Sequence, residues 1–455
     1  MSGTSQTPNE SPPWKVLYNI LRERRSRRFG LGMEMRTGPM AYKSRHQGLP
    51  LSEKEEALLT FAACGITGPA LGDLVYDKGE GGTIMAGLAG RTIPSGDAIQ
   101  TSSLIVMNPE ACYYIKKPGD FKADIVSELA TLAAQEKYLE LYQRTRVKIR
   151  DGRSNPPLEP FFNINCNRWS LYDPSATYFL PIEDFTLLYI NALLEIFNEH
   201  NGIYVRDERA AYRPAGIKKF AKSRGGHLVD DPKKEHTITI QQLETMVTEF
   251  VTSEAGMIIQ NLGLMTQALG LGGFPHWAAH YYSWFKVLGF KMKEMNSTKY
   301  LGMGWFHSIM AKLLNKDQPV PLVTGLDDKD GTSLIKPFCP PNYPSMKEAV
   351  YAVVELKWGK KGIFNKGAAT GAWKNHSKIS NSAPNVSEKA VESTIAYCTY
   401  LYDRYKRFPV YQPPLRTLLG FQVNHVDTEF YDHFYKPDAL SDLQRNHFRD
   451  WHGKE

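Results

Sequence analysis

The sequence predicts a fold that contains both helices and strands, in which one apolar helix lies at the centre. A helical segment within Ser253–Pro275 carries apolar residues on nearly every side of its helical wheel, which is typical of a buried helix. Two short apolar runs, Leu104–Met107 and Pro319–Gly325, are typical of buried strands. With 455 residues and 42% hydrophobic content, the chain can fill a sizeable core around these elements.

Composition argues against several classes of protein. The net charge is +7, but the basic residues are spread along the chain, without the stripe that nucleic-acid-binding proteins show. The five cysteines are widely spaced and form no C-x-x-C pair, which argues against a disulfide framework and against a cysteine zinc site. No apolar segment suits a signal peptide or a membrane span. We therefore expect a cytoplasmic protein that binds neither nucleic acid nor membrane.

The first predicted helix starts at about Trp14 and runs into a basic cluster. This cluster places four arginines around one serine: Arg24, Arg25, Ser26, Arg27 and Arg28. One guanidinium group can donate two parallel hydrogen bonds to the oxygens of a phosphate, and a serine hydroxyl can donate a further one. The alternative interpretation is a solvated helix end, which is favourable because cations interact well with the C-terminal end of a helix dipole.

A second helix is predicted after Ser52, because Ser52 and Glu55 have the spacing of a capping box. A glycine-rich stretch follows this helix and leads to a polar loop that contains Pro94, Ser95 and Gln100. The loop directly precedes the first of the two apolar runs. Polar loops that enter a core strand are common places for a ligand to be held.

The central helix is predicted to end at Gly270–Gly273, because glycines are poor helix formers that suit the left-handed C-cap. Phe274, Pro275 and His276 follow this run. His276 and His280 have the i, i+4 spacing of two metal ligands, but no glutamate follows His276 and no third ligand is evident. We therefore predict no metal site in the chain.

Three segments, in this order, resemble motifs of the flavin-dependent nitroreductase family. The family's Arg-Arg-Ser-x-Arg-type motif is matched by Arg24, Arg25, Ser26 and Arg28. Its Pro-Ser-x-x-Asn-x-Gln-Pro-Trp loop is matched by Pro94, Ser95 and Gln100. Its central helix, of the form Gln-Asn-Leu-x-Leu-x-x-x-Ala-Leu-Gly-Leu-Gly, is matched by residues 260–272.

The resemblance implies an α+β fold, in which helices surround a mixed sheet and a buried central helix. It also implies that the protein binds FMN non-covalently at the interface of a homodimer. It implies an oxidoreductase that moves hydride from NAD(P)H to an electron-poor small molecule such as a quinone, nitroarene or enone. Arginines and a serine suit the FMN phosphate, and the residues after the glycine turn line the flavin ring in the family. The implied cofactor-binding residues are Arg24, Arg25, Ser26, Arg28, Pro94, Ser95, Gln100, Phe274, Pro275 and His276. No catalytic acid or base is implied.

The sequence also departs from the family pattern. Ala98 stands where the family has asparagine, and Thr101 follows Gln100 where the family has proline. These departures leave open a second class, a flavin-fold protein that binds a ligand or a partner without catalysis. The family usually supplies a further basic residue for the phosphate near its C-terminus, and three residues remain open for that role: Arg416, Arg445 and Arg449.

This interpretation divides the chain into four segments. Residues 1–107 are expected to form the first part of the nitroreductase-like domain. Residues 108–237 are expected to form an insertion or a distant version of the family's middle section. Residues 161–172 within it are a candidate lid, or else a structural excursion packed on the surface. Residues 238–335 are expected to hold the central helix and a strand that closes the sheet, and residues 336–455 a C-terminal helical extension.

Overall fold

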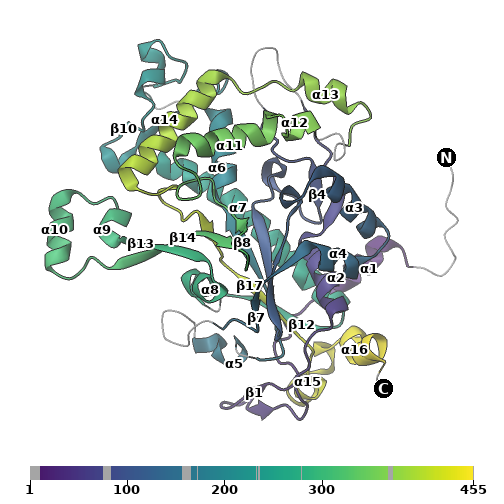
Figure 1. Ribbon diagram of the computed structural model, residues 1–455. Helices are drawn as coiled ribbons and strands as arrows, with labels where there is room; N and C mark the ends of the chain where they lie inside the picture. The colour runs from purple at the N-terminus through teal and green to yellow at the C-terminus, as the bar shows by residue number, and fades with distance from the viewer. Residues whose placement is uncertain are drawn as a thin grey trace.

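A computed structural model describes residues 11–74, 83–155, 165–171, 173–231, 233, 236–277, 279–366 and 372–453. Helices and strands are both abundant, and helices pack on both faces of one large sheet (Figure 1). The predicted α+β class is therefore confirmed. Among the described residues, no helix combines the length and the hydropathy that a membrane span requires. Of the candidate lid, residues 161–164 and Tyr172 lie outside the described residues.

The main sheet contains seven strands, and all of its pairings are antiparallel. Its order is β12 (Gly272–His276), β17 (Gly420–Asn424), β8 (Thr177–Asp184), β5 (Ser102–Met107), β6 (Ala111–Ile115) and β7 (Arg146–Asp151), with β16 (Leu415–Arg416) paired to β8. The predicted strand Leu104–Met107 lies within β5. We expected a mixed sheet, but the observed sheet is antiparallel. Hairpins and long returns connect its strands, and no parallel crossover joins two of its described strands.

Strands β5 and β8 are buried along their whole length, because helices cover the sheet on both sides. Val106 of β5 faces a core that includes α2 (Glu53–Cys64) and α7 (Ile240–Ala268). Its neighbour Ile105 faces the opposite core, which includes α8 (Tyr281–Leu288). Successive side chains of a strand point to opposite faces, so both faces of the sheet centre need apolar residues. This explains the uninterrupted apolar run in the sequence.

The central helix is α7. It starts after Thr239, whose side chain accepts a hydrogen bond from the backbone N–H of Gln242 at 3.1 Å. Its last residue is Ala268, and the chain turns away at Gly270, which has a φ of 74°. A Cβ at that position would stand 2.1 Å from the carbonyl oxygen of Leu443. Only glycine suits that position. The helix starts earlier than predicted, and it is not buried on every side, since Met257 is 37% exposed.

A second core lies around the N-terminal half of α7. It is formed with α6 (Thr186–Ile196), α11 (Met346–Trp358) and α14 (Glu388–Tyr405). The other described α-helices are α1 (Pro13–Glu23), α3 (Ala123–Ala134), α4 (Tyr138–Thr145), α5 (Arg168–Leu171), α9 (Ser297–Tyr300), α10 (Trp305–Leu313), α12 (Ile363–Lys366), α13 (His376–Ser382), α15 (Thr428–Phe434) and α16 (Asp442–His452).

Four smaller sheets complete the described structure. Two are hairpins, β1 with β2 and β3 with β4 (Glu34–Met35, Tyr42–Lys43, Ile66–Pro69 and Ala89–Arg91). A third contains β9, β10 and β11 (Tyr204–Asp207, Arg213–Pro214 and Thr237–Thr239) and holds a parallel pairing, between β9 and β11. The fourth contains β13, β14 and β15 (Lys291–Asn296, Pro319–Asp327 and Ser333–Ile335).

Three of the expected segments differ from the observed arrangement. Residues 108–237, expected as an insertion, supply β6, β7 and β8 to the main sheet. The run Pro319–Gly325 forms a strand, as predicted, but this strand is β14 and does not close the main sheet. Residues 336–455, expected to be helical, also supply β16 and β17, and β17 lies between β12 and β8. Strand pairing depends on distant residues, which local periodicity does not record.

Candidate functional site

The basic cluster follows α1 directly, and its first residues are exposed. Arg24, Arg25 and Ser26 all face solvent. Nη1 of Arg25 donates hydrogen bonds to the backbone carbonyls of Arg22, at 2.9 Å, and of Arg24, at 3.0 Å. Because Arg24 and Arg25 are exposed, both guanidinium groups are accessible to an anion from solvent. The positions of these three side chains are compatible with a phosphate site and with a solvated helix end.

Arg27, in contrast, is buried and takes part in the fold. Its Nε donates to the carbonyl oxygen of Ala439 at 2.8 Å, and its Nη1 donates to Oε1 of Gln267 at 2.7 Å. Gln267 lies in the last turn of α7, and its Nε2 donates to Oγ of Ser441 at 3.2 Å. These bonds fasten the basic cluster to the C-terminal end of α7 and to the segment that leads into α16.

Arg28 lies between two aromatic rings. Its Cζ is 4.9 Å from the ring centroid of Trp169 in α5 and 4.6 Å from that of Phe274 in β12. Contacts of this kind between a guanidinium and an aromatic face hold the cation in position. Burial lowers the pKa of Arg28, which nevertheless stays charged at neutral pH because arginine starts far above it. The sequence did not predict the role of Trp169, which lies far from Arg28 along the chain.

His276 is buried at the end of β12, with its ring 4.8 Å from that of Phe274. Burial and the neighbouring Arg28 lower the pKa of His276 to about 4, although Gln422 acts in the opposite direction. The imidazole is therefore neutral at pH 7. Among the described residues, neither of its ring nitrogens has a hydrogen-bond partner of regular geometry. We call this group the Arg28 cluster: Arg28, Trp169, Phe274 and His276.

The polar loop predicted to bind a cofactor turns inward, toward the middle of α7. Oγ of Ser95 donates to Oε2 of Glu254 at 2.8 Å and accepts the backbone N–H of Gln100 at 2.7 Å. Nε2 of Gln100 donates to the carbonyl oxygen of Ala89 at 2.5 Å. Pro94 remains exposed. The polar groups of Ser95 and Gln100 thus hydrogen-bond within the chain.

Glu254 organises this loop. It is 3% exposed and forms a buried salt bridge with Arg91. Thr101 donates to Oε2 from its backbone N–H, at 3.1 Å, and from its hydroxyl, at 2.9 Å, while the backbone N–H of Ser102 donates to Oε1 at 2.9 Å. A buried carboxylate needs this many donors to offset its lost hydration. The inward turn of the loop follows from that requirement.

The predicted cofactor residues therefore fall into two groups along α7. Glu254 precedes the last residue of the helix by about 20 Å, at about 1.5 Å of rise per residue. The structure brings Arg28, Phe274 and His276 together beyond the C-terminal end, with Pro275 exposed beside them. It does not bring Ser95 and Gln100 to that end within one chain.

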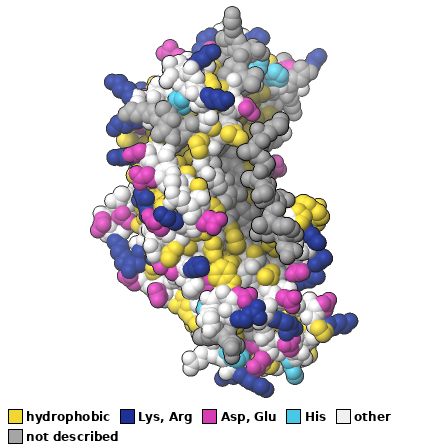
Figure 2. All heavy atoms as spheres, turned by 90° about the vertical axis from the view of Figure 1, so that its right-hand side faces the viewer, with side chains coloured by type: hydrophobic (Ala, Val, Ile, Leu, Met, Phe, Trp, Pro, Cys, Tyr) yellow, Lys and Arg dark blue, Asp and Glu magenta, His cyan; other side chains and the backbone are white. Residues whose placement is uncertain are grey.

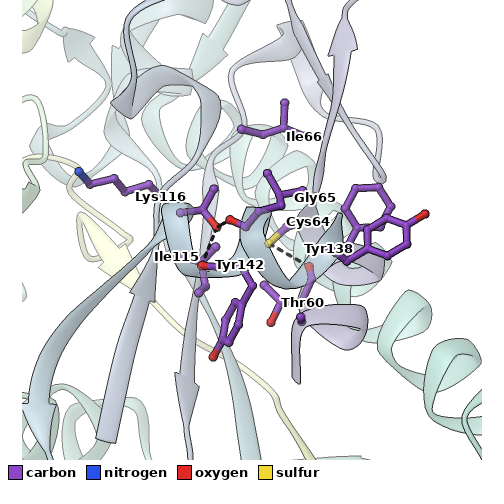
Figure 3. Close-up of a pocket in the computed structure, with 12 residues that line it drawn as sticks. Thr60, Cys64, Gly65, Ile66, Ile115, Lys116, Tyr138 and Tyr142 are labelled. Carbon is purple, nitrogen blue, oxygen red and sulfur yellow. Dashed lines mark hydrogen bonds between the residues drawn. The ribbon is translucent and has the colours of Figure 1, made fainter. Parts of the chain in front are cut away.

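A small cavity lies between α2 and α4 (Figure 3). Its volume is about 20 Å³, and its lining includes Thr60, Cys64, Tyr138 and Tyr142. Sγ of Cys64 lies 3.7 Å from the carbonyl oxygen of Thr60, and burial raises the pKa of the thiol to about 11. A cavity of this size has room for about one water molecule. It is too small for a flavin and holds no thiolate at neutral pH.

The three arginines left open for the phosphate differ in their surroundings. Arg416 forms a salt bridge with the buried Glu183. Arg449 pairs with its exposed neighbour Asp450 at 2.9 Å. Arg445 pairs with Asp432 at 2.9 Å, and both side chains are more than a third exposed. Arg445 and Arg449 both lie on α16, the helix that follows the residues bonded by Arg27 and Gln267, whereas Arg416 lies in β16.

Comparisons with known proteins assign no family to the chain. No family model matches it, and no curated protein matches it. Among solved structures, one similar chain is described as a "putative nitroreductase" from Ralstonia eutropha JMP134, at 12% identity. The similarity covers 63% of this chain and 80% of that chain, with a TM-score of 0.27. Similarity of this size assigns neither a family nor an activity.

Proposed function

We propose that the protein is an FMN-dependent oxidoreductase that transfers hydride from NADH or NADPH to an electron-poor small molecule. The observation that carries the proposal is the Arg28 cluster. Two motifs that are far apart in the sequence, around Arg28 and around Phe274, meet at one end of α7. The matched motifs would bind the phosphate and the ring of one cofactor, so their proximity is what a flavin site requires.

The residues of the basic cluster suit the cofactor's phosphate. Arg24 and Arg25 are exposed guanidinium groups, and Ser26 adds an exposed hydroxyl. Arg28 and the neutral His276 would lie toward the ring, where a fixed cation stabilises negative charge on a reduced flavin. When bound, FMN would supply the hydride chemistry, and the side chains would bind and orient it.

The fit is incomplete at the polar loop. Ser95 and Gln100 hydrogen-bond to Glu254 and Ala89, so their contact with a flavin in the same chain would require those bonds to be exchanged. This observation favours the alternative function, in which a protein of the flavin fold binds a ligand or a partner without catalysis. Anaerobic mixing of the flavin-loaded protein with NADH or NADPH separates the two functions. If the nicotinamide bleaches the flavin and a quinone reoxidises it, the enzyme is supported. If dithionite reduces the flavin and neither nicotinamide does, the binding protein is supported.

The direct test of the cofactor is the visible spectrum of the purified protein. A yellow protein that releases FMN on denaturation supports the proposal. A colourless protein that is folded and does not take up added FMN contradicts it. The measurement requires no knowledge of the substrate, and it tests the cofactor before any activity is sought.

We further propose that the active form is a homodimer. α7 exposes an apolar stripe, with Met246, Phe250 and Met257 at 40%, 56% and 37% exposure. α1, which contacts α7, buries none of its residues and exposes Trp14 and Tyr18, among other apolar side chains. Figure 2 shows the face on the α1 side, with hydrophobic side chains gathered across its middle. A second copy of the chain would cover such an unpartnered apolar surface.

Sedimentation of the wild-type protein and of two variants tests the dimer. Phe250→Asp places a charge in the stripe and should yield a monomer. Tyr351→Asp, at the 45% exposed Tyr351 of α11, is the matched control and should leave the dimer intact. A wild-type protein that is monomeric at high concentration, with and without FMN, would contradict the proposal.

A further inference from the structure

Four metal-ligating side chains from three distant parts of the chain meet beside the C-terminal end of α7. They are Glu55 in the first turn of α2, His425 just after β17, and His447 and His452 in α16. The three Nε2 atoms lie 3.3, 3.1 and 3.3 Å from the same carboxylate oxygen, Oε1 of Glu55. All four ligand atoms lie within 4.8 Å of one another.

Contacts on the outer side of the rings fix their orientation. Nδ1 of His425 is 2.8 Å from the carbonyl oxygen of Leu49, and Nδ1 of His447 is 2.7 Å from that of Leu269. A carbonyl oxygen only accepts hydrogen bonds, so each Nδ1 carries a hydrogen. The Nε2 of a neutral ring is then a lone pair that faces the carboxylate. This outer contact with a backbone carbonyl is the usual support of a metal-binding histidine.

The carboxylate is fixed in the same way. Oε2 of Glu55 accepts the backbone N–H and the hydroxyl of Ser52, at 2.6 and 2.7 Å, in the capping box of α2. These bonds leave Oε1 directed at the three imidazoles. The capping box predicted from the sequence therefore also orients a ligand.

The cluster is buried and contains no permanent cation. The side chains of Glu55 and His425 are 0% exposed, and those of His447 and His452 are 2% and 18% exposed. Among the described residues, no lysine or arginine pairs with Glu55. Nε2 of His447 is buried without a hydrogen bond of regular geometry. A carboxylate and three nitrogen lone pairs repel one another at these distances unless a cation lies between them.

We propose that Glu55, His425, His447 and His452 bind one divalent first-row transition metal ion, of which Zn²⁺ is the best match. Zinc bonds of about 2.0–2.1 Å place tetrahedral ligand atoms about 3.3 Å apart, close to the nitrogen–oxygen distances in the cluster. Imidazole and carboxylate donors suit this class of metal better than Ca²⁺ or Mg²⁺. Four protein ligands complete a tetrahedron, so the ion is structural and joins α16 to α2 and β17. This site lies outside the proposed flavin site and does not depend on it.

The test measures metal binding to the whole protein, prepared without a polyhistidine tag. The wild-type protein, stripped with a chelator, incubated with Zn²⁺ and desalted, should retain about one zinc per chain by mass spectrometry. Co²⁺ in place of Zn²⁺ should produce visible d–d absorption. His447→Ala should abolish both signals, and His433→Ala, at an exposed histidine of α15, should leave both unchanged.

A stable protonated cluster is the competing explanation, and it gives the opposite result. Folded wild-type protein that retains no zinc and shows no d–d absorption with Co²⁺ would overturn the proposal. If His447→Ala fails to fold, His452→Ala replaces it, because His452 lies at the most exposed edge of the cluster. That variant should hold zinc at least tenfold more weakly, and unchanged affinity would also overturn the proposal.

Discussion

The polar groups around the middle of α7 differ in their bonding from those around its C-terminal end. In the middle, Glu254 is paired with Arg91. Its carboxylate also accepts hydrogen bonds from Ser95, Thr101 and Ser102. At the C-terminal end, Arg27 is bonded within the fold, but Arg24 and Arg25 are exposed. Glu55 there faces three imidazoles without a permanent cation among the described residues. A region whose charges are satisfied internally is built for stability. Exposed guanidinium groups, and a buried carboxylate without a permanent cation, leave capacity for ligands.

The largest expected effect breaks the middle region. Arg91→Ala leaves Glu254 buried without its cation, and removal of one partner of a buried pair costs about 3–5 kcal/mol. The free energy of unfolding in urea measures this loss. Arg144→Ala is the control, since Arg144 pairs with Glu128 on the surface and should cost less than about 1 kcal/mol. A small loss for Arg91→Ala would show that the middle of α7 does not depend on this pair.

Metal removal should destabilise the protein through the C-terminal end of α7. A bound ion at about 1,000 times its dissociation constant stabilises a protein by about 4 kcal/mol, so chelation should lower the unfolding temperature by several degrees. Thermal unfolding with Zn²⁺ and with a chelator measures this difference. The Arg144→Ala control should show the same metal-dependent shift as the wild-type protein. A His425→Ala variant should show none, and a full shift in that variant would contradict the assigned ligands.

Acid should weaken the fold through His276. The folded-state pKa of His276 lies at about 4, below its unfolded value near 6.5. The contribution of the neutral ring to the free energy of unfolding is therefore fully present above pH 6.5, and it is lost as the pH falls toward 4. The loss is about 3 kcal/mol at about 1.4 kcal/mol per pKa unit. Unfolding of the wild-type protein and of His276→Asn between pH 7 and pH 4 measures it. The variant should lose less stability than the wild type over this range, and parallel curves would contradict the burial argument.

The smallest expected effect concerns flavin retention. Arg24→Ala should yield a folded protein that binds FMN about tenfold more weakly or worse, since a charge-assisted hydrogen bond contributes about 1.5–3 kcal/mol. Equilibrium dialysis against FMN measures the affinity. Arg36→Ala is the matched control, because Arg36 is exposed and lies outside the basic cluster. Equal affinities in the two variants would return Arg24 to the solvated-helix interpretation.

Local pattern predicted the elements whose causes are local. The capping box at Ser52 and Glu55, the apolar run of β5 and the glycine end of α7 all appear as expected. β17 was not predicted, because its five residues alternate too briefly to stand out. The antiparallel pairing and the place of β14 were also outside local pattern, since both depend on contacts with remote strands.

The candidate sites show the same limit. The sequence indicated the meeting of Arg28 with Phe274 only through the resemblance to a family, while the ring of Trp169 was missed. The inward turn of Ser95 depends on Glu254, which lies far along the chain. Glu55 and its histidines follow no known spacing, as His447 and His452 are five positions apart and the glutamate lies near the other end of the sequence. The prediction of no metal site rested on the cysteine spacing and on His276 and His280, and no local pattern indicated this cluster.

The position of β17 also has a consequence for biosynthesis. Among the described strands, β12 pairs with β17 and with no other, and β17 pairs in turn with β8. Ribosomes release the chain from its N-terminus, so β8 and β12 are made long before the strand that joins them. Until residues 420–424 leave the exit tunnel, the edges of β8 and β12 that pair with β17 stay unpaired in the nascent chain. Chaperones bind unpaired strand edges, and aggregation can start from them.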